Sequence, residues 1–569
     1  MLRKLRWPLL IVLLALVAIG FLLTSQQPVL KPVEAVVEPA TGGVYAEGLI
    51  GSMLRFNPLL DYFNNVDRDV DRLLFSGLVH FNDRGLPQGD LADSWGISRD
   101  GTVYNFSIRQ NAQWHDGTPV TSDDVIFTIE RMREDGSPLP DDLRAFWKQV
   151  EVKRLDEKTL QFRLPESFAP FLDYLTFGVV PEHLLGELTL SEIIESPFNL
   201  QPVGSGPYRF NQLVVEDGKI IGLVLSVNKD FYGKVPFIEG IAFRYYPDAL
   251  SALTAYKEGE IQGINSIPEE ILQEALEIPD LNIHTGRLSE LTLVFLNLNN
   301  PQVDFLKDAQ VRRALLAGMN RQWLIDRILG GQAIVADGPI FPGTWAYYDG
   351  IEHVSYNADE AVNLLKQAGF TIPAEGGSVR KNADGAALSL ELAFPDEPAH
   401  QSLAEAIQRD WGRIGVEVIL KPQPYADLIA NLDKRLYQAA LVDLNLVRSP
   451  DPDPYPFWHQ AQVSGGQNYS QWDDRQASEF LEQARITVDL SERARLYRNF
   501  QVRFTQELPS LPLFYSVYRY AISEAVQGVR MGSLFDSSDR FATINNWFLV
   551  TKRSTGQDIE EPATQTPAP

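Results

Sequence analysis

The sequence contains no cysteine among its 569 residues. This absence excludes disulfides, thiolate nucleophiles, cysteine-ligated zinc, iron–sulfur clusters and lipid attachment to an N-terminal cysteine. Histidine is also scarce, and no two of the seven histidines have the i, i+4 spacing that places two imidazoles on one face of a helix. We therefore predict no bound metal and no cofactor.

Motifs of covalent catalysis are absent as well. The sequence has neither a Walker loop nor a GxGxxG fingerprint. The stretch VGSGPY at 203–208 is not the GxSxG motif, because Gly204 and Gly206 directly flank Ser205, and a tight turn explains it. A secreted hydrolase is one alternative hypothesis, but the sequence shows no nucleophile–base pair to support it. We predict that the chain is not an enzyme.

Basic surface is lacking too. Lysine and arginine number 50 against 75 acidic residues, which gives a formal charge of -25. Such a molecule repels phosphate backbones, so no nucleic-acid partner is expected. The composition is 44% hydrophobic, enough for substantial cores. At roughly 150 residues per domain, the length predicts three to four folding units.

The N-terminus has the charge order of an export signal. Arg3, Lys4 and Arg6 precede an uncharged run over 7–23, which rises roughly 25 Å as a helix. No small-x-small cleavage site follows the run closely. We predict an uncleaved transmembrane anchor over 1–24, with a cleaved signal peptide as the alternative. Either reading places the rest outside the cytoplasm, in the periplasm or at the cell surface.

Both secondary-structure periods occur in the body of the chain. Residues 25–42 are rich in proline and predict a linker, and the tail over 552–569 has the composition of disorder. Val103–Ile108 alternates as a half-buried strand does. Helices are predicted over 121–132 and 357–370, each with a capping residue at its start. The mixture indicates an α/β fold class.

Several sequence blocks occur in a fixed order. The longest, over 91–125, reads LADSWGISRDGTVYNFSIRQNAQWHDGTPVTSDDV. It is followed by VGSGPYRF at 203–210, VRRALLAGMNRQWLIDRIL at 311–329, YNADEAVNLLKQAGF at 356–370 and RIGVEV at 413–418. From about 43 to 530 the chain resembles the family 5 extracellular solute-binding proteins, the peptide- and nickel-type binding components of ABC importers.

The resemblance implies a two-lobed periplasmic-binding-protein-like α/β fold with an additional third domain and a hinged ligand cleft. The expected first lobe has three pieces, over 43–75, 204–293 and 514–551. The additional domain is expected over 76–203 and the second lobe over 294–513.

The resemblance also implies a function without covalent chemistry. The chain is expected to be a membrane-tethered monomer that captures a peptide or other small polar solute and delivers it to ABC permease subunits. The alternative is a solute sensor or docking protein that uses the same fold without transport. A neighbouring permease gene would favour import, and a neighbouring sensor kinase would favour the alternative.

One position departs from the family pattern. Peptide binders of this family pair an aspartate with the ammonium group of the ligand, and alignment on Asp451 places Arg448 at or beside that aspartate. A guanidinium repels an ammonium and suits carboxylate, phosphate or sugar oxygens. Ordinary packing is the alternative for each ligand-binding residue that we predict, which are Glu47, Asn297, Tyr425, Arg448, Asp451 and Trp458.

Overall fold

The computed structural model describes residues 12–17, 20, 36–445 and 450–554. The chain forms two compact units, Met1–Thr41 with Val550–Pro569, and Gly42–Leu549. In the first unit, β1 (Val36–Ala40) pairs antiparallel with β20 (Val550–Ser554). The predicted anchor over 1–24 lies largely outside the described residues. Among the residues that are described, no helix has both the length and the apolar character needed to cross a membrane.

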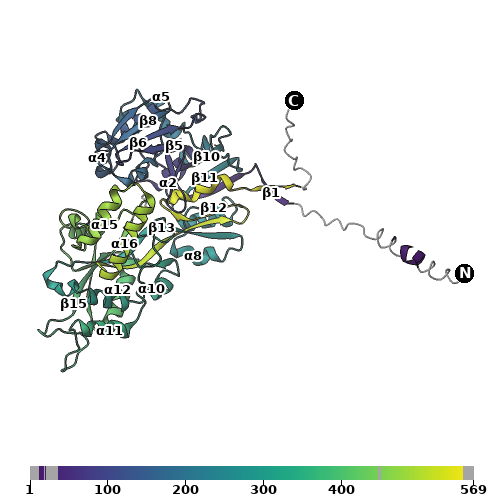
Figure 1. The fold of residues 1–569 in the computed structure, drawn as a ribbon. Coiled ribbons are helices and arrows are strands. Elements are labelled where there is room, and N and C mark those ends of the chain that lie inside the picture. The colour runs from purple at the N-terminus through teal and green to yellow at the C-terminus, as the bar shows by residue number, and fades with distance from the viewer. Residues whose placement is uncertain (1–11, 18–19, 21–35, 446–449, 555–569) are drawn as a thin grey trace, which may run out of the picture. The chain divides into compact units, whose positions relative to one another are not determined.

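A twelve-stranded sheet runs through the second unit (Figure 1). Its strands, in order across the sheet, are β16 (Glu417–Gln423), β15 (Ser389–Pro395), β17 (Ala439–Asn445), β13 (Leu281–Leu296), β18 (Ser510–Ser523), β12 (Gly263–Ile264), β2 (Val44–Ile50), β11 (Gly240–Tyr246), β10 (Lys219–Val227) and β9 (Tyr208–Glu216). Two short strands complete it, β14 (Ala333–Val335) beside β18 and β19 (Ser533–Leu534) beside β13.

Strands β13 and β18 are the two longest and pair antiparallel from Leu281 with Ser523 to Phe295 with Ser510. The register shifts between Arg287 and Leu291, where a bulge or irregularity interrupts the ladder. One end of the pair adjoins β12, and the other end of β13 adjoins β17. The two strands therefore connect the two halves of the sheet, and their ends contribute to different hydrophobic cores.

A separate four-stranded antiparallel sheet forms within 76–203. Its order is β5 (Ala92–Ile97), β6 (Val103–Ile108), β8 (Thr159–Arg163) and β7 (Glu151–Arg154), and β3 (Val79–Phe81) pairs with β4 (Pro87–Gly89) beside it in sequence. Strand β6 has the predicted bounds and alternation. The helices of this region are α3 (Ser122–Arg133), α4 (Asp141–Gln149), η1 (Ala169–Leu175), α5 (Glu182–Leu185), α6 (Leu190–Ile194) and η2 (Pro197–Leu200).

The remaining helices lie outside the region 76–203. They are α2 (Asn65–Leu74), α7 (Ala249–Lys257), α8 (Glu269–Leu276), η3 (Pro301–Lys307), α9 (Ala309–Ala317), α10 (Arg321–Ile328), α11 (Ala358–Gln367), α12 (Pro398–Arg413), α13 (Tyr425–Asp433), α14 (Tyr455–Trp458), η4 (Gln460–Gln462), α15 (Arg475–Ile486), α16 (Leu490–Glu507) and η5 (Ser537–Asn546).

The two helix starts predicted from sequence are confirmed. The capping box of α3 joins Thr121 and Asp124, and the side chain of Asn357 accepts a hydrogen bond from the main-chain N–H of Glu360 at 3.0 Å to start α11. Each cap satisfies helix N–H groups that have no partner inside the helix.

Candidate functional site

A cavity of about 440 Å³ lies where four stretches of the chain meet. Helix α2 with the segment after it forms one wall, the region from α3 to η1 forms a second, and the start of η5 forms a third. The fourth contribution to the lining is Pro450, which is separate in sequence from the other three stretches. A volume in this range suits a small-molecule ligand.

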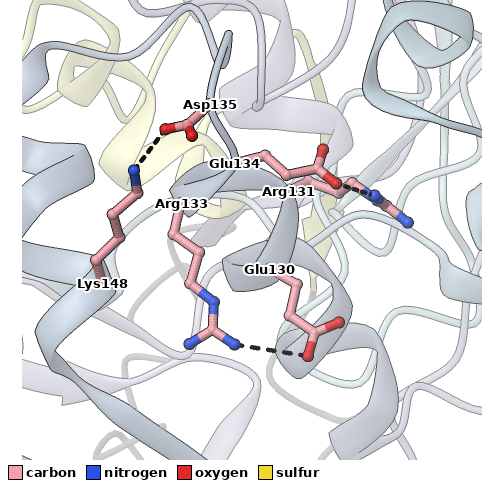
Figure 2. A pocket seen from close by; sticks show the side chains of 6 residues that line it. All are labelled: Glu130, Arg131, Arg133, Glu134, Asp135 and Lys148. Carbon is pink, nitrogen blue, oxygen red and sulfur yellow. Dashed lines mark hydrogen bonds and ion pairs between the residues drawn. The ribbon is translucent and has the colours of Figure 1, made fainter.

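A second depression is a feature of the outer surface. Figure 2 shows its six charged residues, which come from the end of α3, the following turn and α4. They form exposed ion pairs, Lys148 with Asp135 at 2.5 Å, Arg131 with Glu134 at 2.5 Å and Arg133 with Glu130 at 3.7 Å. These charges neutralise one another in solvent and leave no apolar wall for a ligand, so we place the site in the cavity beside α2.

Helix α2 carries three buried aspartates at alternate positions, Asp67, Asp69 and Asp71. Asn64 starts the helix, accepting a hydrogen bond from the N–H of Val66 at 2.9 Å. At 100° per residue, positions i and i+4 share a face and position i+2 points elsewhere. Asp67 and Asp71 are therefore neighbours, while Asp69 faces a different part of the core.

Asp69 belongs to an ion cluster in the core, in which one of its carboxylate oxygens is paired. Arg540 lies between two carboxylates and donates to Asp69 at 2.6 Å and to Glu47 at 2.7 Å. Glu47 also accepts from the hydroxyls of Tyr45 and Tyr520, each at 2.7 Å. The neighbouring carboxylates raise the pKa of Arg540, although burial opposes them. The cluster ties α2, β2 and η5 together beneath the cavity.

Asp67 has main-chain partners. Its carboxylate accepts from the N–H groups of Leu54 and Arg55, each at 2.9 Å. Burial nevertheless raises its pKa to about 6, because the two hydrogen bonds only partly offset desolvation.

Asp71 lines the cavity and is 3% exposed. Within the described part of the chain, neither of its carboxylate oxygens has a hydrogen-bond partner. Burial raises its pKa well above the ordinary value, and the nearby charges of Asp61 and Asp67 raise it further. The nearby main-chain N–H of Asn57 lowers the pKa of Asp71, but by less than burial raises it. The site thus contains a carboxyl group that is paired with no cation among the described residues.

The two arginines of the cavity wall have carboxylate partners. Arg68 pairs with Asp536 at 2.8 Å and Arg72 pairs with Asp539 at 3.3 Å. Burial lowers the pKa of His80, the third basic group of the lining, which favours its neutral form. These contacts join α2 to η5.

Aromatic rings form much of the remaining wall. The lining includes Phe75, Trp147, Tyr174, Phe177 and Phe535. The rings of Trp147 and Phe177 meet edge to face, with centroids 5.8 Å apart. Among the described residues, the indole N–H of Trp147 has no acceptor. The cavity therefore combines flat apolar surface with a small number of polar groups, as ligand sites do.

The segment after Pro450 is held on two sides. The N–H of Asp451 donates to the Asp173 carboxylate at 2.7 Å, which connects this segment to η1. The Asp451 carboxylate pairs with Arg493 at 2.5 Å and accepts from the Tyr497 hydroxyl at 3.0 Å. Contacts of this kind fix the position of Pro450 at the cavity.

The structure places the residues predicted from sequence in several environments. Glu47 lies in the Arg540 cluster, and Asn297 donates to the carbonyl of Tyr437 at 2.9 Å. Trp458 is buried against Phe500 and Phe504, whereas Tyr425 on α13 is 62% exposed. Arg448 lies outside the described residues.

None of the five described residues of that set belongs to the cavity lining. Asp451 is the nearest of them in sequence, since it follows the lining residue Pro450. Sequence reasoning assigned no role to Asp71 or Trp147. The one available signal was the pattern NVDRDVDRLL over 65–74, in which acidic residues recur inside an otherwise amphipathic helix.

Comparison with known proteins identifies the class. The family model described as bacterial extracellular solute-binding proteins, family 5, matches residues 87–467. The chain belongs to this family, so it is an extracellular solute-binding protein and not an enzyme, as the sequence predicted. The two-lobed α/β fold class is also confirmed.

Individual relatives cover most of the chain. The oligopeptide-binding protein AppA of Bacillus subtilis strain 168 is 25% identical over 526 residues, covering 90% of this chain and 93% of that protein. The dipeptide-binding protein of Escherichia coli K12 is 26% identical over 510 residues, covering 84% and 90%. The structure of NikZ from Campylobacter jejuni with Ni(L-His) has a TM-score of 0.64 at 26% identity, covering 89% of this chain and 99% of that one.

A fourth relative adds information on the fold alone. The unliganded open form of the periplasmic murein tripeptide-binding protein MppA has a TM-score of 0.76 at 20% identity, covering 91% of this chain and 99% of that one. Within the described part of our chain, no group of three or more histidine, aspartate or glutamate side chains is arranged to hold a metal ion.

Proposed function

We propose that the chain captures a peptide or a similar small polar solute in the cavity beside α2 and delivers it to an ABC importer. The observation that carries this proposal is the cavity itself, where residues over 58–81, 132–178 and 535–539 meet Pro450 in a family 5 chain. Relatives named as oligopeptide- and dipeptide-binding proteins support a peptide-like solute.

The proposed lobes follow the boundaries expected from the sequence. The first lobe comprises 43–75, 204–293 and 514–551, the additional domain 76–203 and the second lobe 294–513. With these boundaries all three contribute to the cavity lining, and β13 and β18 pass from one lobe to the other. The bulged stretch of that pair is a suitable hinge, because an interrupted ladder bends more easily than a regular one.

We further propose that residues 1–24 tether the chain to the cytoplasmic membrane and that the folded part is a monomer. The basic residues before an uncharged run support the tether. N-terminal sequencing of the exported chain tests it. A mature chain that starts between residues 24 and 41 and is released from membranes would contradict it.

Arg448 remains a proposed contact for an anionic or oxygen-rich part of the solute. It stands two positions before Pro450, which lines the cavity. Glu47, Asn297, Asp451 and Trp458 are kept as proposed ligand-binding residues, although none of them belongs to the cavity lining. Tyr425, which is exposed, is proposed as a flat apolar contact at the cleft edge.

Titration of the full-length chain with small-angle scattering tests the capture. A solute that bridges two lobes shifts the chain toward a closed state by its differential affinity for that state, so compaction and binding must saturate together. The radius of gyration is expected to fall as calorimetric saturation is reached. An unchanged radius of gyration at saturation would contradict the closure. If the solute binds but its uptake by cells does not depend on an ABC permease, the sensor or docking role is favoured.

A further inference from the structure

We propose that Asp71 is the counter-charge for a cationic group of the solute, an ammonium or a guanidinium. This inference rests on the proposed solute capture in the same cavity and adds the chemistry that the cavity selects. Asp71 lines the cavity, is 3% exposed, and has no hydrogen-bond partner on either carboxylate oxygen among the described residues.

The other two acidic residues of α2 show what a buried carboxylate ordinarily has. Asp69 accepts from Arg540 at 2.6 Å, and Asp67 accepts from two main-chain N–H groups. A buried polar group left without a partner destabilises the fold, and a charged one does so more strongly. Asp71 carries this cost in the described state. A cation that enters from the cavity would remove it, because it supplies both a donor and a positive charge.

Acidic side chains are common among the described residues of the lining. Six of them are aspartates, Asp61, Asp71, Asp142, Asp173, Asp536 and Asp539. The two arginines among the same described residues, Arg68 and Arg72, are paired with Asp536 and Asp539. Neither of these arginines is a hydrogen-bond partner of Asp71.

A second side chain without a partner indicates what else the solute carries. The indole N–H of Trp147 lines the same cavity and has no acceptor within the described part of the chain. Its natural partner is a carbonyl oxygen, because the indole group only donates. The aromatic faces of Phe75 and Phe177 add surface for an apolar body and for a cation over a ring. A cation, an amide carbonyl and an apolar portion together describe a cationic peptide-like solute.

Two sources of the cation are possible, the peptide N-terminus and a basic side chain. Four probes separate them, Ala-Phe-Ala with a free N-terminus, its N-acetyl form, N-acetyl-Ala-Lys-Ala and N-acetyl-Ala-norleucine-Ala. The full-length chain is titrated with each by calorimetry. We expect at least one cationic member to bind about tenfold or more tightly than its neutral counterpart, since charge-assisted hydrogen bonds contribute on the order of 1.5–3 kcal/mol.

Asp71→Asn keeps the size of the side chain and removes the charge. It should weaken the preferred cationic probe by about ten- to hundredfold and change the matched neutral probe by less than about twofold. Asp135→Asn is the control, since Asp135 is an exposed aspartate of the surface depression outside the cavity, and it should change neither affinity. If Asp71→Asn does not fold, Asp71→Ser replaces it, and the preference of the wild type stands as a test in its own right.

Each result has one meaning. Equal affinities for cationic and neutral probes, or an unchanged cation affinity in Asp71→Asn, overturn the role of Asp71 while leaving solute capture intact. If the wild type binds none of the four probes at millimolar concentration, the peptide-like solute of the proposed function fails, and the inference that rests on it fails with it.

Discussion

Two carboxylates on the same helix have opposite surroundings. Asp69 is bound by Arg540 inside a cluster that also holds Glu47. Asp71, two residues further on, lines the cavity and has no hydrogen-bond partner in the described part of the chain. Both are buried, and burial raises the pKa of both. The difference separates two tasks of α2. One carboxylate fastens the helix to β2 and η5, and the other is the one that we propose as a solute contact.

The largest effect is a loss of stability, expected when the ion cluster of Arg540, Asp69 and Glu47 is broken. Arg540→Met removes the cation that Glu47 and Asp69 share, leaving two buried carboxylates uncompensated. Breaking a buried pair in this way costs about 3–5 kcal/mol of unfolding free energy, which urea denaturation measures. The triple change Glu47→Gln, Asp69→Asn and Arg540→Met should recover part of the loss. A single variant as stable as the wild type would remove the contrast between the two aspartates.

The second effect concerns solute affinity and the proposed contact at Arg448. Arg448→Ala should weaken a solute that carries an anionic or oxygen-rich group by about 1.5–3 kcal/mol, or about ten- to hundredfold. Arg448→Asp should weaken it further. Its competing role is an exposed ion pair with Asp443 or Asp451, which would contribute about 0–1 kcal/mol to stability and nothing to binding. Asp443 already accepts from Thr292 at 2.5 Å and from His400 at 3.0 Å.

Calorimetric titration of the wild type and both variants with the identified solute decides between the two roles. Equal affinities within twofold, with unchanged melting temperatures, would show that Arg448 does not contact the solute.

The raised pKa of Asp71 should make the unfolding free energy depend on pH. The folded pKa of Asp71 is raised, so between the unfolded value near 4 and the folded value the native state binds the extra proton. The contribution of Asp71 to the unfolding free energy therefore falls as the pH rises through this window. Asp71→Asn removes that fall and should be more stable than the wild type at pH 8, on the order of 1 kcal/mol, and nearer to it at pH 4. Greater stability of the wild type at pH 8 would indicate an unrecognised partner for Asp71.

The smallest effect is expected at the surface depression. Lys148 pairs with Asp135, but the side chains are 48% and 93% exposed. Lys148→Ala should change the unfolding free energy by at most about 1 kcal/mol and leave solute affinity unchanged. Thermal unfolding and the same titration measure both. A loss of solute affinity in this variant would move the site from the cavity to the surface of α3 and α4.

Much of the fold was predictable because its signals are local. The alternation over Val103–Ile108 and the caps at Thr121 and Asn357 each depend on residues a few positions apart, and each appears in the structure. The order of the sequence blocks added the family and, with it, the fold class.

The site was far less predictable because it is assembled from distant segments. Asp71, Trp147 and Pro450 are brought to one cavity by the tertiary structure, and no spacing rule connects them. The absence of a partner for Asp71 is a property of its surroundings, which the sequence does not record. Glu47 illustrates the reverse case, since a polar residue on a strand suggested a ligand contact and lies instead between Arg540 and two tyrosines.

The most direct test of the account is the crystal structure of the full-length chain with the solute that co-purifies with it, identified by mass spectrometry. The account predicts one solute molecule in the cavity between α2, η1 and η5, with a nitrogen cation within hydrogen-bond distance of the Asp71 carboxylate. Solute density elsewhere, or an anionic or uncharged group placed against Asp71, would contradict it.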